Sequence, residues 1–369
     1  ILHLPADLNQ SIALLRKTLA EARREGKKMI PFGARHSMGK QSIQENAIHI
    51  DLKNLRAMKL EDGLLRVEAG ARWSQVLNFL APRGLAVEVM QSNADFSIGG
   101  TLSVNAHGWQ PERPPVASTV DRIRIMTADG ELKICSRTEN QNLFRHALGG
   151  YGMMGILLEA WIRPVKNEIL RSSHQVTTPS EFLSHWEKMK KEPVRLAFGR
   201  LSVAPDSFFE KILLVSYLPT DEISKEPVTV KTGFRTSLSR AIFRASLGSK
   251  RGKNFRNLME GIAGGEAGGT HPRASLLIEP VRIFANNDPH KIDLLLEVFI
   301  PQERFSGFIP KAANLLRIRS GELLNVTVRE IAQDSDTALP YAKTKVFGLV
   351  MLFTLCLLYT SDAADDRVS

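Results

Sequence analysis

Residues 92–108 read SNADFSIGGTLSVNAHG, the most distinctive stretch of the chain. It is rich in glycine and small hydroxyl side chains, which let the backbone approach a ligand or another strand closely. Two other stretches share this character, PFGARHSMG at residues 31–39 and LFRHALGGYGMMGIL at residues 143–157. Backbone N–H groups and hydroxyls from three such loops can converge on one phosphate-bearing ligand. Their order and spacing therefore predict a binding site in the first half of the chain.

Gly150, Gly152 and Gly155 spell GxGxxG, the pattern of the dinucleotide-binding Rossmann fold. That pattern works only after a strand and at the start of a helix, whose N-terminus meets the pyrophosphate. Here a helical turn at residues 143–148 precedes the glycines, and the apolar strand 155–162 follows them. A nicotinamide-dependent dehydrogenase is the alternative that this motif suggests, and the order of the elements disfavours it.

The periodicity of apolar residues predicts an α+β protein with two domains. The first half mixes short strands with helices, which we expect at residues 7–24 (helix), 28–32, 47–52, 64–68 (strands), 74–83 (helix) and 121–135 (hairpin). The second half should form an antiparallel sheet covered on one face. Its strands are expected at residues 169–177, 194–202, 211–217, 278–284, 294–300, 323–333 and 347–354. Helices are expected after Ser180 and at residues 302–317.

The composition narrows the class of protein. The chain has 369 residues, of which 43% are hydrophobic and 24% charged, as in globular proteins. Two cysteines cannot build a disulfide framework, and the sequence shows no metal-ligand spacing, so we expect no metal. The longest apolar run, at residues 346–358, is too short to span a membrane. A cytoplasmic location is expected, although a chain that begins at Ile1 leaves export or anchoring open.

The formal charge is +10, and eight basic residues without a single acid lie within residues 231–256. This segment is interpreted either as an amphipathic surface helix that contacts anionic lipid, or as a solvated insertion. We favour the solvated insertion and expect no nucleic-acid partner; peripheral membrane contact stays open. Residues 356–366 read CLLYTSDAADD, which looks like a translated sequencing adapter. We therefore expect residues 356–369 to be foreign to the protein and the second domain to be incomplete.

The three glycine-containing stretches, in this order, resemble the vanillyl-alcohol oxidase and p-cresol methylhydroxylase superfamily over residues 5–165. The resemblance implies a two-subdomain FAD-binding domain of the PCMH type at residues 1–165 and a substrate-binding domain at residues 166–355. The second half is similar to the alditol and aldonolactone oxidase branch, where VTVREIAQD at residues 326–334 lies near the substrate. Expected is hydride transfer to flavin N5 from a CH–OH group of a polyol, sugar, aldonolactone or hydroxy acid, with dioxygen or another acceptor reoxidising the flavin.

The resemblance also assigns cofactor-binding residues. His36 is expected to carry the flavin covalently through its 8α-methyl carbon; the alternative is a histidine that only hydrogen-bonds the cofactor. The residues expected to cradle the pyrophosphate and ribityl chain, or else to form ordinary turns, are Gly33, Ala34, Arg35, Ser37, Ile98, Gly99, Gly100 and Ser103. Near the isoalloxazine ring or the adenine end we expect His107, Gly108, Gly150, Gly152 and Gly155.

Arg329 and Glu297 are the catalytic candidates of the second half. By the resemblance, Arg329 lies over the flavin, where a guanidinium can hold a substrate hydroxyl and stabilise negative charge; the alternative is an exposed strand arginine. Relatives often carry an acid two positions earlier, where this chain has Thr327. Glu297, within the apolar strand LLLEVFI, is either an inward polar group at the site or a structural carboxylate. The departure at Thr327 leaves the substrate class open, as are the oligomeric state and a membrane-associated flavin-binding role.

Overall fold

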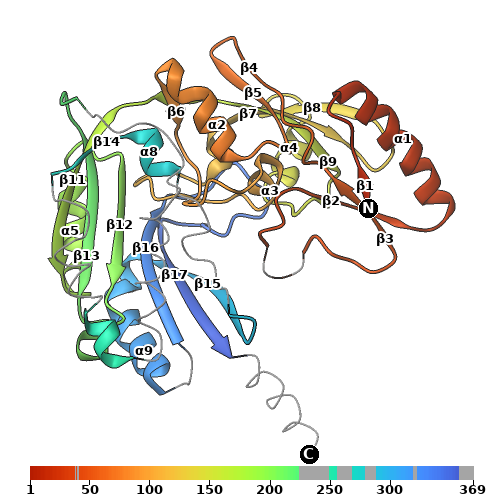
Figure 1. Ribbon diagram of the computed structural model, residues 1–369. Coiled ribbons are helices and arrows are strands. Elements are labelled where there is room, and N and C mark those ends of the chain that lie inside the picture. Colours follow the sequence, from red (N-terminus) through yellow and green to blue (C-terminus); the bar gives the residue numbers. More distant parts are fainter. Residues whose placement is uncertain are drawn as a thin grey trace, which may run out of the picture.

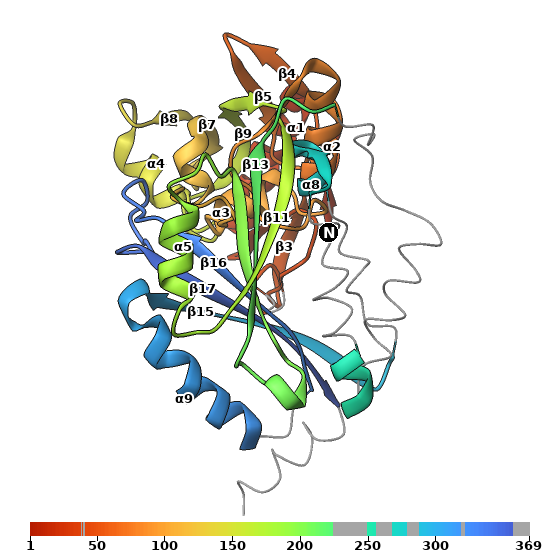
Figure 2. The ribbon, with the colours of Figure 1, turned by 90° about the vertical axis from the view of Figure 1, so that its left-hand side faces the viewer.

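The computed structural model describes residues 1–37, 39, 41–223, 249–255, 268–278, 288–318 and 322–356. Elements of the first half, red to yellow in Figure 1, lie together on one side of the molecule. The green and blue strands of the second half form one large sheet beside them, and Figure 2 shows this sheet after a quarter turn. The α+β class expected from the sequence is confirmed.

The chain opens with a helix and a small parallel sheet. Helix α1 (Leu8–Arg24) begins at Asp7, whose side chain accepts a hydrogen bond from the N–H of Gln10. Strands β1 (Leu2–His3), β3 (Ala47–Asp51) and β2 (Lys28–Phe32) pair in that order, all parallel. Because β2 ends at Phe32, the segment that starts with Gly33 leaves this sheet at its edge.

A five-stranded antiparallel sheet forms the centre of the first half. Its strands, in spatial order, are β4 (Met58–Glu61), β5 (Leu64–Glu68), β9 (Ile156–Ile162), β7 (Val120–Met126) and β8 (Leu132–Ser136). Every residue of β9 is buried, which explains its mostly apolar sequence, and its one charged residue, Glu159, pairs with Arg66 and Arg124. The surrounding elements are α2 (Trp73–Leu80), η1 (Ala81–Arg83), α3 (Ile98–Ser103), η2 (Val116–Thr119), α4 (Gln141–Ala147), and the pair β6 (Leu85–Val87) and β10 (Pro164–Lys166).

A seven-stranded sheet dominates the second half, and all its described pairings are antiparallel, as predicted. In spatial order the strands are β14 (Thr270–Pro272), β11 (Ile169–Thr177), β13 (Ile212–Pro219), β12 (Leu196–Leu201), β16 (Glu322–Ile331), β17 (Val346–Cys356) and β15 (Lys291–Pro301). The accompanying helices are α5 (Phe182–Met189), η3 (Pro205–Ser207), α8 (Arg273–Leu277), η5 (Gln302–Arg304) and α9 (Phe305–Ile318).

The two faces of this sheet differ, and we call them the back face and the front face. The back face packs against α5 and α9 through a cluster of fully buried aromatic rings, Phe182, Trp186, Phe305 and Phe347. Since side chains alternate along a strand, the neighbours of Phe347 face the other way. That front face meets the first half of the chain, where Trp109 packs edge-on against Phe198 and Tyr217, with ring centroids 5.6 Å apart in both pairs.

Three expectations need correction or fall outside the described residues. The stretch that begins at Ile98 is not a loop, because Ile98–Ser103 forms helix α3. Of the strand expected at residues 278–284, Ile278 instead follows α8, and the remainder lies outside the described residues. So does the basic segment 231–256, apart from residues 249–255. Strand β17 runs to Cys356; residues 357–369 are not described, and their foreign origin and the domain boundaries stay predictions.

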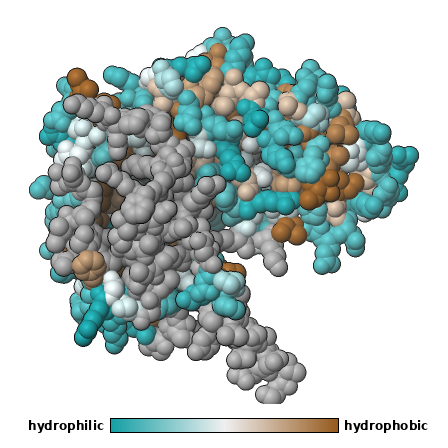
Figure 3. All heavy atoms as spheres, in the orientation of Figure 1, coloured by the Kyte–Doolittle hydropathy of each residue, from teal (hydrophilic) through white to brown (hydrophobic). Residues whose placement is uncertain are grey.

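Membrane-spanning helices and metal-ion sites are both absent among the described residues. None of their helices has the length and apolar character needed to cross a bilayer. Among them, no group of histidine, cysteine, aspartate or glutamate side chains is arranged to hold a metal ion. Figure 3 shows a face that is mostly hydrophilic where residues are described, with hydrophobic groups gathered over the first half of the chain.

Candidate cofactor and substrate site

The three glycine-containing stretches meet in space, as predicted. The backbone N–H of Ala34 donates to the Ser97 hydroxyl at 3.3 Å, which joins the first stretch to the second. The N–H of Tyr151 donates to the carbonyl of Ser103 at 2.8 Å, which joins the third stretch to the second. A Cβ at Gly152 would lie 3.8 Å from Pro31, so the third stretch also borders the first. These contacts build one continuous surface from segments that are far apart in the sequence.

Helix α3 lies at the centre of this surface, and its first N–H groups are already used. Ser97 is its N-cap, and the Ser97 hydroxyl accepts a hydrogen bond from the N–H of Gly100. The N–H groups of Ile98 and Gly99 donate to the carbonyls of Ala71 and Ala69, both at 2.8 Å. These two amides hold α3 against the five-stranded sheet, so a ligand at this helix would have to be bound through other groups.

Several of the glycines have a structural reason that involves no ligand. A Cβ at Gly150 would lie 1.9 Å from the carbonyl oxygen of His146, and one at Gly155 would lie 2.3 Å from that of Met126. A Cβ at Gly108 would lie 2.3 Å from the carbonyl oxygen of Met90. Helix α4 precedes the GxGxxG residues and strand β9 follows them. The structure therefore has the opposite order to a Rossmann fold, as the sequence indicated.

His36 lies where the first stretch passes the second. Its ring packs against Phe96 with centroids 4.8 Å apart, and its Nε2 atom is buried without a hydrogen-bond partner among the described residues. Burial lowers the pKa of His36 below the usual value, and this outweighs the opposing effect of the Asp95 carboxylate. A neutral, half-buried imidazole near pH 7 can act as a nucleophile or accept a hydrogen bond. The buried Nε2, which has no hydrogen-bond partner in the described part of the chain, is the feature of this surface that most strongly indicates a bound group.

Arg35 and Ser37 flank His36 in the first stretch. Arg35 adopts a left-handed conformation with a φ of 56°, and its guanidinium lies over the ring of Phe32 at 3.6 Å. This cation–π contact ties the arginine to the end of β2. Arg35 is therefore anchored beside the three converging stretches, instead of extending freely into solvent.

His107 of the second stretch reaches across to the front face of the seven-stranded sheet. Its Nε2 lies 2.6 Å from Oε1 of Glu297 on β15, and its Nδ1 lies 2.9 Å from the carbonyl oxygen of Gly108. The His107 side chain is 8% exposed and that of Glu297 28% exposed. Two predicted site residues, 190 positions apart, thus form one hydrogen-bonded pair. Glu297 thus faces the first half of the chain, and its role in the site stays a prediction.

Gly348 gives the Glu297 carboxylate its space. The register places Gly348 of β17 between Arg329 of β16 and Phe299 of β15. A Cβ at Gly348 would lie 2.9 Å from Oε1 of Glu297 and 2.9 Å from Ile331. The missing side chain therefore opens a gap on the front face, and the carboxylate leans into it.

Arg329 lies on the same front face as this carboxylate. Burial raises the pKa of Glu297, but His107 and Arg329 together outweigh that effect, so the pKa lies below the usual value of a glutamate. Thr327, two residues before Arg329, is buried and accepts a 3.3 Å hydrogen bond from the amide of Asn325. The front face thus presents an ionised carboxylate, a guanidinium and the Thr327 hydroxyl, and the His107 imidazole meets the carboxylate from the first half of the chain.

Phe299 and Tyr341 form an aromatic wall beside the pair. Their rings stack with centroids 4.5 Å apart, and each meets the His107 ring edge-on, at 6.0 Å and 6.2 Å. Burial raises the pKa of the Tyr341 phenol well above its usual value. The phenol therefore keeps its proton, which it donates to the carbonyl oxygen of Asn105 at 2.9 Å.

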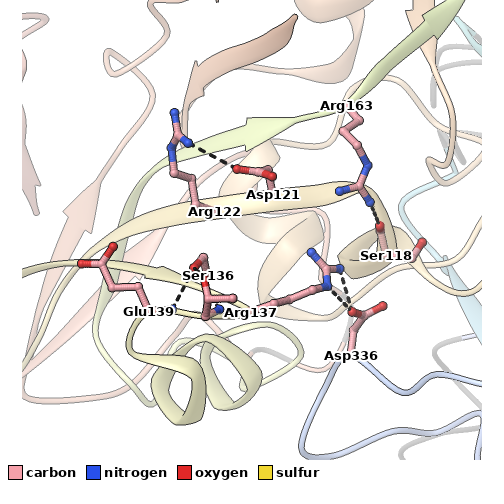
Figure 4. Close-up of a pocket in the computed structure, with 9 residues that line it drawn as sticks. Ser118, Asp121, Arg122, Ser136, Arg137, Glu139, Arg163 and Asp336 are labelled. Carbon is pink, nitrogen blue, oxygen red and sulfur yellow. Dashed lines mark hydrogen bonds and ion pairs between the residues drawn. The ribbon is translucent and has the colours of Figure 1, made fainter. Parts of the chain in front are cut away.

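A pocket of about 610 Å³ lies elsewhere, and Figure 4 shows its lining. Its residues are Ser118, Asp121, Arg122, Ser136, Arg137, Thr138, Glu139, Arg163 and Asp336. None of them is a predicted site residue. The Arg137 guanidinium points at Asp336, with its Nε 2.8 Å from the carboxylate, and Arg122 pairs with Asp121 at 3.4 Å. This pocket is a polar seam where residues 332–345 meet the first half of the chain.

Comparison with known proteins identifies the domain that contains the first two of the three converging stretches. Residues 8–136 match the family described as FAD binding domain. The chain carries an FAD-binding domain. The expected relationship to PCMH-type flavoproteins and the expected FAD cofactor are confirmed.

Two curated relatives carry the same name. The D-arabinono-1,4-lactone oxidase of Yarrowia lipolytica is 31% identical over 186 residues, which are 48% of this chain and 35% of that protein. The enzyme of that name from Saccharomyces cerevisiae is 25% identical over 191 residues, 50% of this chain and 36% of that protein. An uncharacterized oxidoreductase of the fasciation locus of Rhodococcoides fascians is 29% identical over 133 residues, 36% of this chain and 30% of that protein. The matched stretch thus spans about a third of these relatives.

The residues of this structure fit FAD. His36 supplies a buried, unpaired nitrogen on the first stretch, and the segments that carry Ser103 and Gly152 meet on the same surface. The residues that sequence reasoning missed are Asn105, Tyr341 and Gly348. Gly348 had a signal, since a glycine within an apolar strand often marks close approach of another group. Asn105 and Tyr341 had none, because their partners lie 229 and 236 residues away.

Proposed function

We propose that this protein oxidises a CH–OH group with FAD, and that its substrate is an aldonolactone or a closely related polyol or sugar. The observation that carries the proposal is the His107–Glu297 pair. It joins the FAD-binding domain to the front face of the sheet, and the proposal takes this junction as the substrate site. The names of the relatives support the lactone.

Bound FAD supplies the hydride acceptor, and this chain's side chains handle the proton. The Glu297 carboxylate is the base that takes the proton from the substrate hydroxyl, because its low pKa keeps it ionised. His107, 2.6 Å away, holds that carboxylate in place and shares its charge. Positioned carboxylates of this kind contribute about 10²–10⁴-fold to proton-transfer steps.

Arg329 is the second substrate-binding group of the proposal. It lies opposite Gly348 on the front face and acts on the Glu297 carboxylate through its charge. A guanidinium there can donate hydrogen bonds to a substrate oxygen and stabilise negative charge that develops on it. Thr327 offers a neutral hydroxyl at the position where an acid is common in relatives. The site therefore carries less negative charge than an aspartate or glutamate would give it.

Anaerobic mixing of the flavin-loaded protein with substrate tests this function. D-arabinono-1,4-lactone, an alditol and a 2-hydroxy acid are added in turn, and the loss of flavin absorbance is followed. Bleaching by the lactone or the alditol supports the proposal. Bleaching by the hydroxy acid alone would indicate a hydroxy acid as the substrate in place of a lactone or polyol. A flavin that none of the three substrates reduces would overturn the proposed oxidation.

His36 is proposed to be the attachment point of the flavin. The support is its buried, unpaired Nε2 and its neutral imidazole. After acid precipitation, a covalent flavin stays with the pellet, and His36→Ala should release it to the supernatant. Release from the unaltered protein would leave His36 as a hydrogen-bonding residue only.

A further inference from the structure

Residues 332–345, which connect β16 to β17, are held to the cofactor half by several contacts, and one of them runs through the buried side chain of Asn105. The others include the Arg137–Asp336 ion pair and the backbone N–H groups of Ala332 and Ala338, which donate to carbonyl oxygens of the first half. The Nδ2 of Asn105 donates to Oδ2 of Asp334 at 3.0 Å, and its Oδ1 accepts a hydrogen bond from the N–H of Ala117, also at 3.0 Å. Its own carbonyl oxygen accepts the Tyr341 phenol at 2.9 Å. Asn105 is only 2% exposed, so each of these bonds is shielded from water.

Asp334 is organised to receive this amide. Its Oδ1 accepts hydrogen bonds from the N–H groups of Asp336 and Thr337, at 2.9 Å and 3.2 Å. Its Oδ2 accepts the Thr337 hydroxyl in addition to Asn105. Both oxygens of this buried carboxylate serve as acceptors, so removing one donor leaves a buried acceptor unsatisfied. Asp334 therefore favours a donor, not an acceptor, at position 105.

The backbone at Asn105 connects this fastening to the proposed active site. Asn105 has a φ of 48°, a left-handed conformation that asparagine and aspartate adopt more readily than other non-glycine residues. His107 follows two residues later, and Tyr341, which holds the Asn105 carbonyl, stacks on Phe299 of β15. Glu297 lies on the same strand, two residues before Phe299. Asn105 is thus linked to both partners of the His107–Glu297 pair, to His107 through the backbone and to the strand of Glu297 through Tyr341 and Phe299.

We propose that Asn105 is a positioning residue: by bonding Asp334 and Tyr341 it couples the FAD-binding half to the substrate sheet and holds His107 against Glu297. Only the expected effect of this coupling on turnover depends on the function proposed above. The docking of residues 332–345 is measurable without any substrate.

The decisive experiment reverses the direction of the buried hydrogen bond. Asn105→Asp places a second carboxylate against Asp334, whereas the double variant Asn105→Asp with Asp334→Asn restores one donor and one acceptor. The new amide at position 334 then has one hydrogen for the carboxylate at position 105 and one for the Thr337 oxygen. Hydrogen–deuterium exchange of residues 332–345 and kcat against KM are measured for both. Asn54→Asp is the matched control, since Asn54 donates a 2.8 Å hydrogen bond to the carbonyl oxygen of Leu4, away from the site.

Asn105→Asp should speed exchange in residues 332–345 and lower kcat by about 10–100-fold with little change in KM, since small displacements of reacting groups cost that much. The double variant should recover both readouts, and the control should change neither. Tyr341→Phe, which removes one hydroxyl only, should give the same pattern more weakly and serves if Asn105→Asp does not fold. Unchanged exchange in Asn105→Asp and Tyr341→Phe, or a double variant no better than the single one, would overturn the coupling. Faster exchange in a protein that oxidises none of the substrates would keep the coupling and remove the proposed function.

Discussion

The two faces of the seven-stranded sheet use the same strands for different purposes. On the back face, Val328 and Phe347 are fully buried beneath α5 and α9. On the front face, Arg329 and Gly348, their immediate neighbours in the chain, border the Glu297 carboxylate. Because successive side chains of a strand point to opposite faces, one residue stabilises the fold and the next shapes the site.

In the sheet, residues that stabilise the fold and residues that shape the site are separated more clearly than in the first half of the chain. There, α3 uses the N–H groups of Ile98 and Gly99 to pack against the sheet, while Ser103 of the same short helix joins the third stretch. Structural and ligand-facing groups share one segment in the first half. In the sheet they lie on different sides, so substitutions should divide into two classes.

The largest expected effect is on the front face. Glu297→Gln removes the proposed base but keeps its shape, so the rate of flavin reduction by substrate should fall about 10²–10⁴-fold. Flavin content and melting temperature should stay close to those of the unaltered protein. Glu303→Gln, on the exposed turn η5, is the control and should react normally. A Glu297→Gln protein that reacts at the normal rate would remove Glu297 from the chemistry.

The back face should respond in stability. Phe347 is fully buried among aromatic rings, with the ring of Phe305 5.0 Å away. Phe347→Ala should lower the free energy of unfolding by about 3–5 kcal/mol, as large-to-small core substitutions do. Urea denaturation measures this, and Phe347→Leu should cost less. A folded Phe347→Ala protein of normal stability with impaired flavin reduction would contradict the division between the faces.

Gly348→Ala should lower both the stability of the protein and its turnover. The new methyl group would lie 2.9 Å from both Glu297 Oε1 and Ile331, so the carboxylate must move or the strand must shift. Overpacking of this kind costs about 1–3 kcal/mol, and we expect turnover to fall with it. Gly307→Ala in α9 is the matched control, because its new methyl group meets nothing within 4 Å. Normal turnover in Gly348→Ala would show that the gap at Gly348 does not position Glu297.

The smallest effect is a pH dependence. Since the pKa of Glu297 is lowered in the folded protein, its ionised form contributes stability above the unfolded pKa of a glutamate, and this is lost as pH falls through the folded pKa. The acid limb of kcat/KM should therefore lie below the usual pKa of glutamate. His107→Gln should raise this limb, because one of the two groups that lower the pKa is gone. An acid limb that does not move in His107→Gln would show that a charge other than that of His107 sets the pKa of the group seen in this limb.

Much of the fold followed from local signals. The largely apolar sequence of β9, the Asp7 cap of α1 and the alternation in β16 depend on residues close in sequence. The expected loop at Ile98 was wrong, because a helix of six residues holds two glycines that local propensity disfavours. Ser97 capping and hydrogen bonds to Ala69 and Ala71 outweigh that preference.

Residue types and their order along the chain were enough to select the candidates for the chemistry, which are His36, His107, Glu297 and Arg329. The folded structure was needed to find that His107 bonds Glu297, that Gly348 leaves room for that carboxylate, and that Asn105 bonds Asp334. His107 and Glu297 are 190 residues apart in the sequence, and Asn105 and Asp334 are 229 residues apart. Residue type and spacing carry local preferences, whereas a pairing over such distances follows from how the sheet packs on the cofactor half.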